Sequence, residues 1–315
     1  MKLSWTDIEA ARVLLGESFP PTPLQVAKSL SQGSKHVYLK NETVLPTGAF
    51  KVRGALYALH AEMKRRALKE VVAASTGNHG AGVAYAAQRA GVPAAIFLPE
   101  RSNAVKRARI ADLGARIVEA GADITAALAA MRRYARETGA FMLDDAVIPD
   151  VPVATATIGW EIVEQLPNVT EIWVPMGDTA LIRGVATAAK HLRPSVRIVG
   201  VQAETAPSYY LSWKKGEVIE TETCLTIADG LATRTPTAGN VADVRELVDD
   251  INLVSDEQML DAIRHLRAHE NVLAEPAGAA TTAAWLRYGS PAGAAEVALV
   301  VTGGNIAEEI LRQVS

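Results

Sequence analysis

The sequence has very little cysteine and no excess of positive charge. Its 315 residues include one cysteine, Cys224, so no disulfide can form within the chain. Lysine and arginine together number 32, against 35 aspartate and glutamate residues, which gives a net charge of -3. Because the chain has no broad basic field to hold a nucleic acid, we expect no nucleic-acid partner.

Long apolar runs and several common motifs are also missing. The apolar stretches fall far short of the roughly 20 residues that cross a bilayer, so we expect no membrane segment. The N-terminal MKLSWTDIEAARVLL is amphipathic and mixed in charge, unlike a secretion signal, and we expect a cytoplasmic protein. No G-x-G-x-x-G after a strand, P-loop, G-x-S-x-G or H-E-x-x-H occurs, which disfavours dinucleotide-binding, P-loop, hydrolase and zinc-protease functions.

Short apolar runs alternate with longer helical patterns along the chain. Strands are expected at 37–40, 71–75, 94–99, 115–120, 171–176, 197–203 and 296–301, and helices at 49–66, 79–90, 103–113, 122–138, 155–166, 180–193, 256–270, 276–288 and 305–313. Continuous apolar strands are typical of sheets that helices cover on both faces. We therefore predict an α/β protein with two open, largely parallel sheets flanked by helices. The expected division is a large domain of residues 1–69 and 148–315, with a small domain of residues 70–147 inserted in it.

Four segments combine glycine with small polar residues at a strand end or a helix start. They are KNETVLPTGAFKVRGA (40–55), STGNHGAGVAYAA (75–87), VPMGDTALIRG (174–184) and VVTGGN (300–305). In α/β sheets this edge is where ligands bind, and the amides of a helix start suit an anion. Any one glycine cluster fits a simple tight turn about as well, and Lys51 alone fits an exposed helix face. The four segments together favour a ligand site.

Together and in this order, the segments resemble the fold-type II pyridoxal-phosphate (PLP) enzymes, specifically the serine/threonine dehydratase and serine racemase branch of the tryptophan synthase β-like superfamily. The resemblance covers nearly the whole chain and implies that the large domain binds the cofactor. TGAFKVRGA is similar to the dehydratase signature T-G-[SA]-F-K-x-R-G-A. By this resemblance Lys51 is the lysine that binds PLP covalently, and Phe50 packs against the cofactor ring.

Two other segments of the resemblance imply further ligand contacts. STGNHG is similar to the S-x-G-N-H-G loop that binds the substrate carboxylate, which implies substrate-binding roles for Ser75, Thr76, Gly77, Asn78 and His79. Asn78 then also reaches the phenolic oxygen of the cofactor. TGGN is similar to S-G-G-N and makes Thr302 the partner of the pyridine nitrogen. Glu275 matches a carboxylate near the cofactor, although an acidic residue at a helix start explains it nearly as well.

The phosphate-binding segment departs from the four glycines that are usual in the family. The cofactor-binding positions here are Gly177, Asp178, Thr179, Ala180 and Leu181. A carboxylate beside a phosphate dianion is unfavourable unless it points away or is paired. Either Asp178 turns outward while the Thr179 hydroxyl donates, or Arg183 one turn later offsets the charge.

The cation site known in this branch is expected to be incomplete. Glu204 matches its first ligand, but Tyr210 stands at the position of the aspartate. We therefore expect no bound metal.

The resemblance implies a homodimeric ammonia-lyase that converts a β-hydroxy amino acid such as L-threonine or L-serine to a 2-oxo acid and ammonia. Lys51 would be the base at Cα, which requires a lowered pKa, and burial against Phe50 near other cationic groups would lower it. A hydroxyl at Thr302 in place of a carboxylate leaves the pyridine nitrogen largely unprotonated, which favours elimination over transamination.

Three other functions stay open. Thr76 stands where serine racemases carry the base of the opposite face, so it is a second candidate catalytic residue, although a simple turn residue is the preferred interpretation. The altered phosphate segment also fits a dehydratase for an unusual hydroxylated amino acid, such as those of hydroxyectoine catabolism. The third alternative is a non-catalytic PLP-binding protein.

Overall fold

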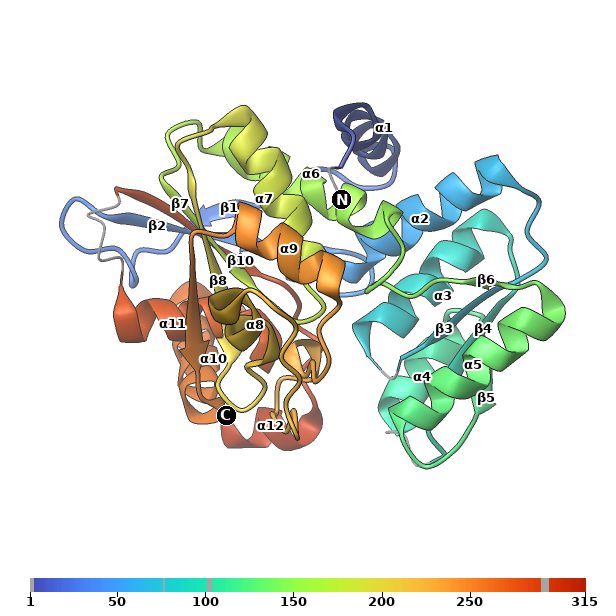
Figure 1. Ribbon diagram of the computed structural model, residues 1–315. Coiled ribbons are helices and arrows are strands. Elements are labelled where there is room, and N and C mark those ends of the chain that lie inside the picture. Colours follow the sequence, from blue (N-terminus) through green and yellow to red (C-terminus); the bar gives the residue numbers. More distant parts are fainter. Residues whose placement is uncertain (1–2, 76, 101–103, 290–294) are drawn as a thin grey trace.

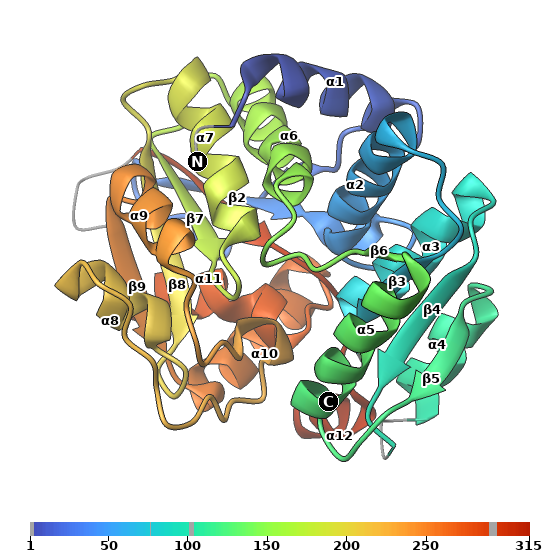
Figure 2. The same cartoon turned by 45° about the vertical axis from the view of Figure 1, so that its right-hand side comes forward.

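The computed structural model describes residues 3–75, 77–100, 104–289 and 295–315 (Figures 1 and 2). The larger of its two sheets has the strand order β1-β2-β10-β7-β8-β9. These strands are β1 (Leu24–Val26), β2 (His36–Asn41), β10 (Glu296–Val301), β7 (Glu171–Pro175), β8 (Arg197–Ala203) and β9 (Asp250–Val254). Every pair is parallel except the edge strand β1, which runs antiparallel to β2.

The second sheet has four parallel strands in the order β5-β4-β3-β6. They are β5 (Arg116–Glu119), β4 (Ala94–Leu98), β3 (Val71–Ala74) and β6 (Phe141–Met142). In Figure 1 this sheet lies on the right, apart from the larger one. Its strands fall within the range that the sequence analysis gives to the small domain, and we propose that this range folds as a unit.

Successive residues of a strand point to opposite faces of its sheet, and in both sheets helices cover these two faces. Val71, Ala73 and Ile96 pack against α2 (Lys51–Arg65) and α3 (Asn78–Ala90), whereas Val72, Ala95 and Phe97 pack against α5 (Ile124–Thr138). On the larger sheet, one face packs against α10 (Asp256–Glu270) and α11 (Pro276–Tyr288), and the other against α6 (Asp150–Gln165), α7 (Ala180–Leu192) and α9 (Ala238–Leu247). The predicted fold class is confirmed.

The remaining elements are short or peripheral. They are α1 (Trp5–Gly16), α4 (Ala104–Asp112), α8 (Ser208–Lys215), α12 (Glu308–Gln313) and the 3-10 helices η1 (Glu42–Val44) and η2 (Asp229–Leu231). Among the described residues, no helix has both the length and the apolar character that crossing a membrane requires.

Several elements differ from those predicted from the sequence, and two helices begin elsewhere than predicted. Strands β1, β6 and β9 and helices α8 and α9 were not expected, and the helix expected from 305 begins only at Glu308. The helix expected from 155 already begins at Asp150. Pro152 lies in its first turn, where the missing N–H of proline has no intrahelical partner to lose.

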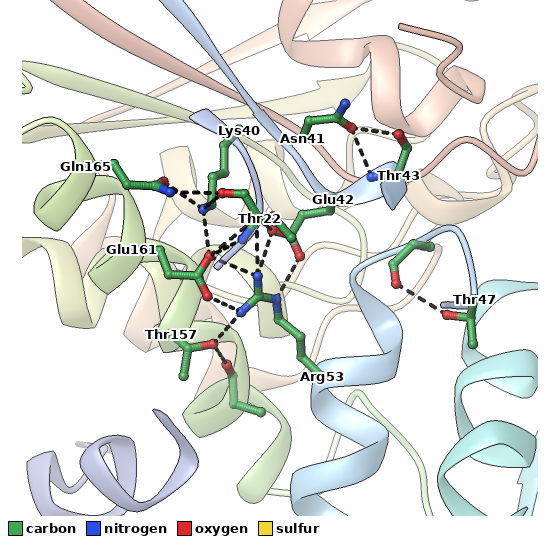
Figure 3. A network of polar contacts seen from close by, with 12 residues as sticks. Thr22, Lys40, Asn41, Glu42, Thr43, Thr47, Arg53, Thr157, Glu161 and Gln165 are labelled. Carbon is green, nitrogen blue, oxygen red and sulfur yellow. Dashed lines mark hydrogen bonds and ion pairs between the residues drawn. The ribbon is translucent and has the colours of Figure 1, made fainter. Parts of the chain in front are cut away.

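A buried network of charged side chains joins α2 to β2 and α6 (Figure 3). Arg53 on α2 donates through Nε to Glu42 at 2.8 Å and through Nη2 to Glu161 at 3.0 Å. Lys40 on β2 donates to the same Glu161 carboxylate at 2.6 Å. The side chains of Arg53 and Lys40 are 1% and 0% exposed. The charges of these two cations therefore balance those of two carboxylates in a largely buried network. Arg53 follows Lys51 by two residues, and the network therefore fixes the first turn of α2.

Replacing Arg53 by methionine should lower the free energy of unfolding by about 3–5 kcal/mol, because Glu42 loses its buried cation and Glu161 keeps only Lys40. Urea unfolding followed by circular dichroism measures this change. The control is Arg312→Met, which breaks an exposed pair with Glu308 and should cost at most about 1 kcal/mol. Equal effects of the two substitutions would contradict the assigned importance of the buried network.

Candidate active site

A cavity of about 520 Å³ lies where the carboxyl ends of strands from both sheets meet. Its walls include the segments after β3, β7 and β10 and the start of α2. The predicted site residues that line it are Phe50, Lys51, Ser75, Gly77, Asn78, His79, Gly177, Asp178, Thr179, Leu181, Glu275 and Thr302. The four segments singled out in the sequence are thus brought together around one cavity. Thr76 lies outside the described residues.

Lys51 enters this cavity because the turn before α2 is fastened to the end of β10. The N–H of Phe50 donates to the carbonyl of Thr302 at 2.9 Å, and the N–H of Gly304 donates to the carbonyl of Gly48 at 2.9 Å. Segments that lie about 250 residues apart in the chain are therefore paired through their backbones. The centre of the Phe50 ring lies 5.1 Å from Lys51 Nζ.

Two carboxylates hold the amine of Lys51. Nζ donates to Asp178 at 2.8 Å and also to Asp145, and the lysine side chain is 16% exposed. Burial is the largest influence on this ammonium and lowers its pKa, but the two carboxylates outweigh burial and hold the pKa above its ordinary value. The expectation of a lowered pKa is therefore wrong for these neighbours, since carboxylates stand where cationic groups were expected.

Asp145 connects Lys51 to His79 on the four-stranded side of the cavity. Its carboxylate lies 3.3 Å from Nδ1 of His79, whose Nε2 donates to the carbonyl of Leu143 at 2.8 Å. Burial raises the pKa of Asp145, yet His79 and Lys51 outweigh burial and hold it below the usual range of an aspartate. Asp145 was not predicted as a site residue, because it lies in an irregular segment after a two-residue strand that gives no sequence signal.

The start of α7 has the features of an anion-binding site, but an aspartate of the protein itself, Asp178, already lies there. Thr179 takes a left-handed backbone conformation, with φ of 74°, and its buried Oγ1 has no hydrogen-bond partner among the described residues. A Cβ on Gly177 would lie 2.0 Å from the carbonyl oxygen of Gly230, so only glycine fits there. Asp178 accepts the N–H of Ala180 at 2.8 Å, so a carboxylate already uses one amide of the helix start.

Both hypotheses about the altered phosphate segment need correction. Asp178 does not turn outward, because its carboxylate bridges Lys51 and the helix start. Arg183 does not pair with Asp178, since its Nη1 donates to Asp243 at 3.2 Å. The charge of Asp178 is offset by Lys51 instead.

The segment predicted to bind the substrate carboxylate forms the start of α3. Ser75 Oγ accepts the N–H of Gly77 at 3.2 Å, and α3 begins at Asn78 with no side-chain cap. The first N–H groups of a helix have no partner within the helix, so a carboxylate from the cavity can accept them. The Asn78 side chain donates to Glu275 at 2.6 Å, which joins two predicted cofactor-binding residues directly.

The family model described as "Pyridoxal-phosphate dependent enzyme" matches residues 17–303. The chain belongs to this family of PLP-dependent enzymes. Its relatives include L-threonine ammonia-lyase of Geobacter sulfurreducens, 37% identical over 270 residues, covering 86% of this chain and 67% of the relative.

Solved structures of PLP-family proteins resemble this fold over nearly its whole length. Maize serine racemase superposes with a TM-score of 0.93 at 31% identity, covering 99% of this chain and 97% of the other. A threonine deaminase from T.th. superposes with a TM-score of 0.88 at 32% identity, covering 97% of this chain and 99% of the other. The similar structures thus include both a racemase and a deaminase.

The residues around the cavity fit PLP. Lys51 supplies the amine, Thr179 supplies an unpartnered hydroxyl at a helix start, and Thr302 supplies a hydroxyl at the end of β10. Asp178 lies just before α7, where the phosphate would bind, and its negative charge opposes a phosphate dianion and should weaken cofactor binding.

Glu204, the predicted remnant of a cation site, is exposed beside the end of β8. Within the described part of the chain, no three histidine, cysteine, aspartate or glutamate side chains are grouped as metal ligands.

Asp178→Asn should strengthen PLP binding by about 10-fold or more, because it removes a like charge near the phosphate and keeps an acceptor for Ala180. Titration of the lysine-linked cofactor by its visible absorbance gives the dissociation constant. Asp261→Asn, the same change at an exposed position that pairs with Arg264, should leave that constant unaltered. Weaker binding in Asp178→Asn would show that the carboxylate assists the cofactor.

Proposed function

We propose that this PLP-dependent enzyme dehydrates and deaminates a β-hydroxy amino acid, with L-threonine or L-serine as substrate and a 2-oxo acid and ammonia as products. For L-threonine, the substrate atoms equal those of 2-oxobutanoate plus ammonia, since the water that is lost is regained on hydrolysis. The observation that carries the proposal is the Lys51 amine in the cavity, within hydrogen-bonding distance of two carboxylates. Threonine ammonia-lyases at 37% identity support the choice of substrate.

Bound PLP supplies delocalisation of the negative charge that forms at Cα when the proton there is removed. Lys51 takes that proton. Because Asp145 and Asp178 hold the pKa of Lys51 above its ordinary value, the amine must lose its own proton before it acts as the base. The two carboxylates then stabilise the ammonium that forms. The same two carboxylates fix the direction of Nζ.

The helix start of α3 orients the substrate. Its backbone amides bind the substrate carboxylate opposite Lys51, which places the Cα hydrogen toward the amine. Thr302, which lines the cavity, would hold the pyridine nitrogen of PLP with a hydroxyl in place of a carboxylate, and this would favour elimination of the β-hydroxyl over transamination. Phe50, Gly177, Thr179 and Leu181 form a wall that would hold the cofactor. Ala180 is not among the residues that line the cavity, and its N–H donates to Asp178.

Racemisation is the second candidate, because maize serine racemase superposes with a TM-score of 0.93. It requires a base on the face opposite Lys51, which is the role that Thr76 would take. A dehydratase for a different hydroxylated amino acid uses the same residues with another side-chain pocket.

A homodimer in the cytoplasm is also part of the proposal. The dimer rests on the resemblance to fold-type II enzymes. The cytoplasmic location rests on the single cysteine, which cannot pair within the chain.

The PLP-loaded protein should release 2-oxobutanoate and ammonia from L-threonine, and pyruvate and ammonia from L-serine. Lys51→Ala should lower kcat/KM by about 100-fold or more through loss of the base. Lys64→Ala, at an exposed position on the same helix, is the matched control and should retain full activity.

The same reactions run in deuterated water and followed by NMR and chiral chromatography separate the two candidates. A deaminase gives the oxo acid and no D-enantiomer, whereas a racemase gives deuterated D-amino acid. Full activity in Lys51→Ala would contradict the proposal.

A further inference from the structure

Four side chains form a continuous polar chain along the cavity wall. Arg109 Nη1 donates to Asn305 Oδ1, and Asn305 Nδ2 donates to Asn78 Oδ1 at 2.6 Å. Asn78 Nδ2 then donates to Glu275 Oε1 at 2.6 Å. All four residues line the cavity, and they come alternately from the four-stranded side (Arg109, Asn78) and the six-stranded side (Asn305, Glu275). These hydrogen bonds therefore cross between the two sides three times.

The two ends of this chain fix the orientation of both amides between them. A guanidinium only donates hydrogen bonds, and a carboxylate only accepts them. Asn305 must therefore turn its oxygen to Arg109 and its NH₂ to Asn78, and Asn78 must turn its NH₂ to Glu275. Glu275 thus sets the orientation of Asn78, while Arg109 is the donor that holds the oxygen of Asn305. Without that donor, Asn305 loses one of the contacts that keep its NH₂ against Asn78. Arg109 thus holds Asn305 in the position from which it donates to Asn78, and so helps to keep the Asn78 amide in place.

The loop before Lys51 also holds the side chains of Arg109 and Asn305. The carbonyl of Thr47 accepts from Arg109 Nη2 at 2.5 Å and from Asn305 Nδ2 at 2.9 Å. A Cβ on Gly48, whose φ is 66°, would lie 2.6 Å from Asn305 Oδ1, so only glycine leaves room for this side chain. The hydrogen-bond acceptors of Arg109 are thus an amide oxygen and a backbone carbonyl. Burial lowers the pKa of Arg109, and Glu275 partly offsets this effect from a distance.

A partly buried arginine bonded to neutral groups is costly for stability, which favours a functional reason for its position. An NH₂ group carries two protons, and Glu275 takes one of those on Asn78. The other can be donated to an acceptor in the cavity. By the family resemblance, this is the proton that Asn78 would donate to the phenolic oxygen of PLP.

We propose that Arg109 is a positioning residue, which acts through Asn305 to hold the Asn78 amide with its second N–H directed at the cofactor. The inference rests on the proposed PLP-binding role of Asn78 and adds two residues that the sequence motifs do not assign to this role. Arg109 itself performs no proton transfer.

Asn305→Asp tests the donor-to-acceptor direction of the hydrogen bonds that link Arg109, Asn305 and Asn78, and it keeps the shape of the side chain. The new carboxylate still accepts from Arg109 but donates nothing to Asn78, so kcat/KM for L-threonine should fall about 10-fold, the effect of one lost hydrogen bond. The visible absorbance band of the lysine-linked PLP should shift as its oxygen loses a fixed donor. Arg109→Met should give the same two effects, and combining the substitutions should add little more.

Arg109→Lys is the conservative rescue, because an ammonium also only donates, and it should retain the wild-type band and most of the activity. Arg107→Met removes a neighbouring arginine that pairs with Glu119 and should change neither property. A wild-type band and kcat/KM in Asn305→Asp would overturn the proposal, whatever Arg109→Met does. If wild-type protein lacked turnover of every hydroxy amino acid, the absorbance band would still test Asn78 orientation separately from the proposed reaction.

Discussion

The site depends on one contact, the ammonium of Lys51 held between Asp145 and Asp178. The two carboxylates come from opposite sides of the cavity, Asp145 after β6 of the small sheet and Asp178 after β7 of the large sheet. Lys51 therefore ties the two sheets together as well as pointing into the cavity. The contact stabilises the ammonium, which is the form of the lysine after it has taken a proton, whereas the lysine acts as a base only from its neutral form.

Two further features make this placement rigid. The backbone pairing of Gly48 and Phe50 with the end of β10 sets where the chain turns into α2. The buried charges around Arg53 then hold the first turn of that helix against β2 and α6. Such networks are retained where a unique position matters, since well-packed apolar groups stabilise a core at least as well. The position fixed here is that of the amine two residues earlier.

Much of the fold follows from the sequence because buried parallel strands are continuous apolar runs, as in β7 and β10. Strand β6 has two residues and β9 alternates polar and apolar positions, so neither gives that signal. The four glycine-containing segments predict the cavity walls, since their turns are local. Asp145, Arg109 and Asn305 gain their roles only through contacts between distant segments. The charge state of Lys51 could not be predicted for the same reason, because it depends on which distant side chains surround the amine.

The central claim is that the amine of Lys51 reacts with the aldehyde of PLP. Reduction of the PLP-loaded protein with borohydride, followed by peptide mapping, tests it most directly. We expect a single pyridoxyl label on the peptide that contains Lys51, with Lys64 of the same helix unlabelled. A label on another lysine, or an unlabelled Lys51 in protein that retains its visible absorbance, would contradict this account.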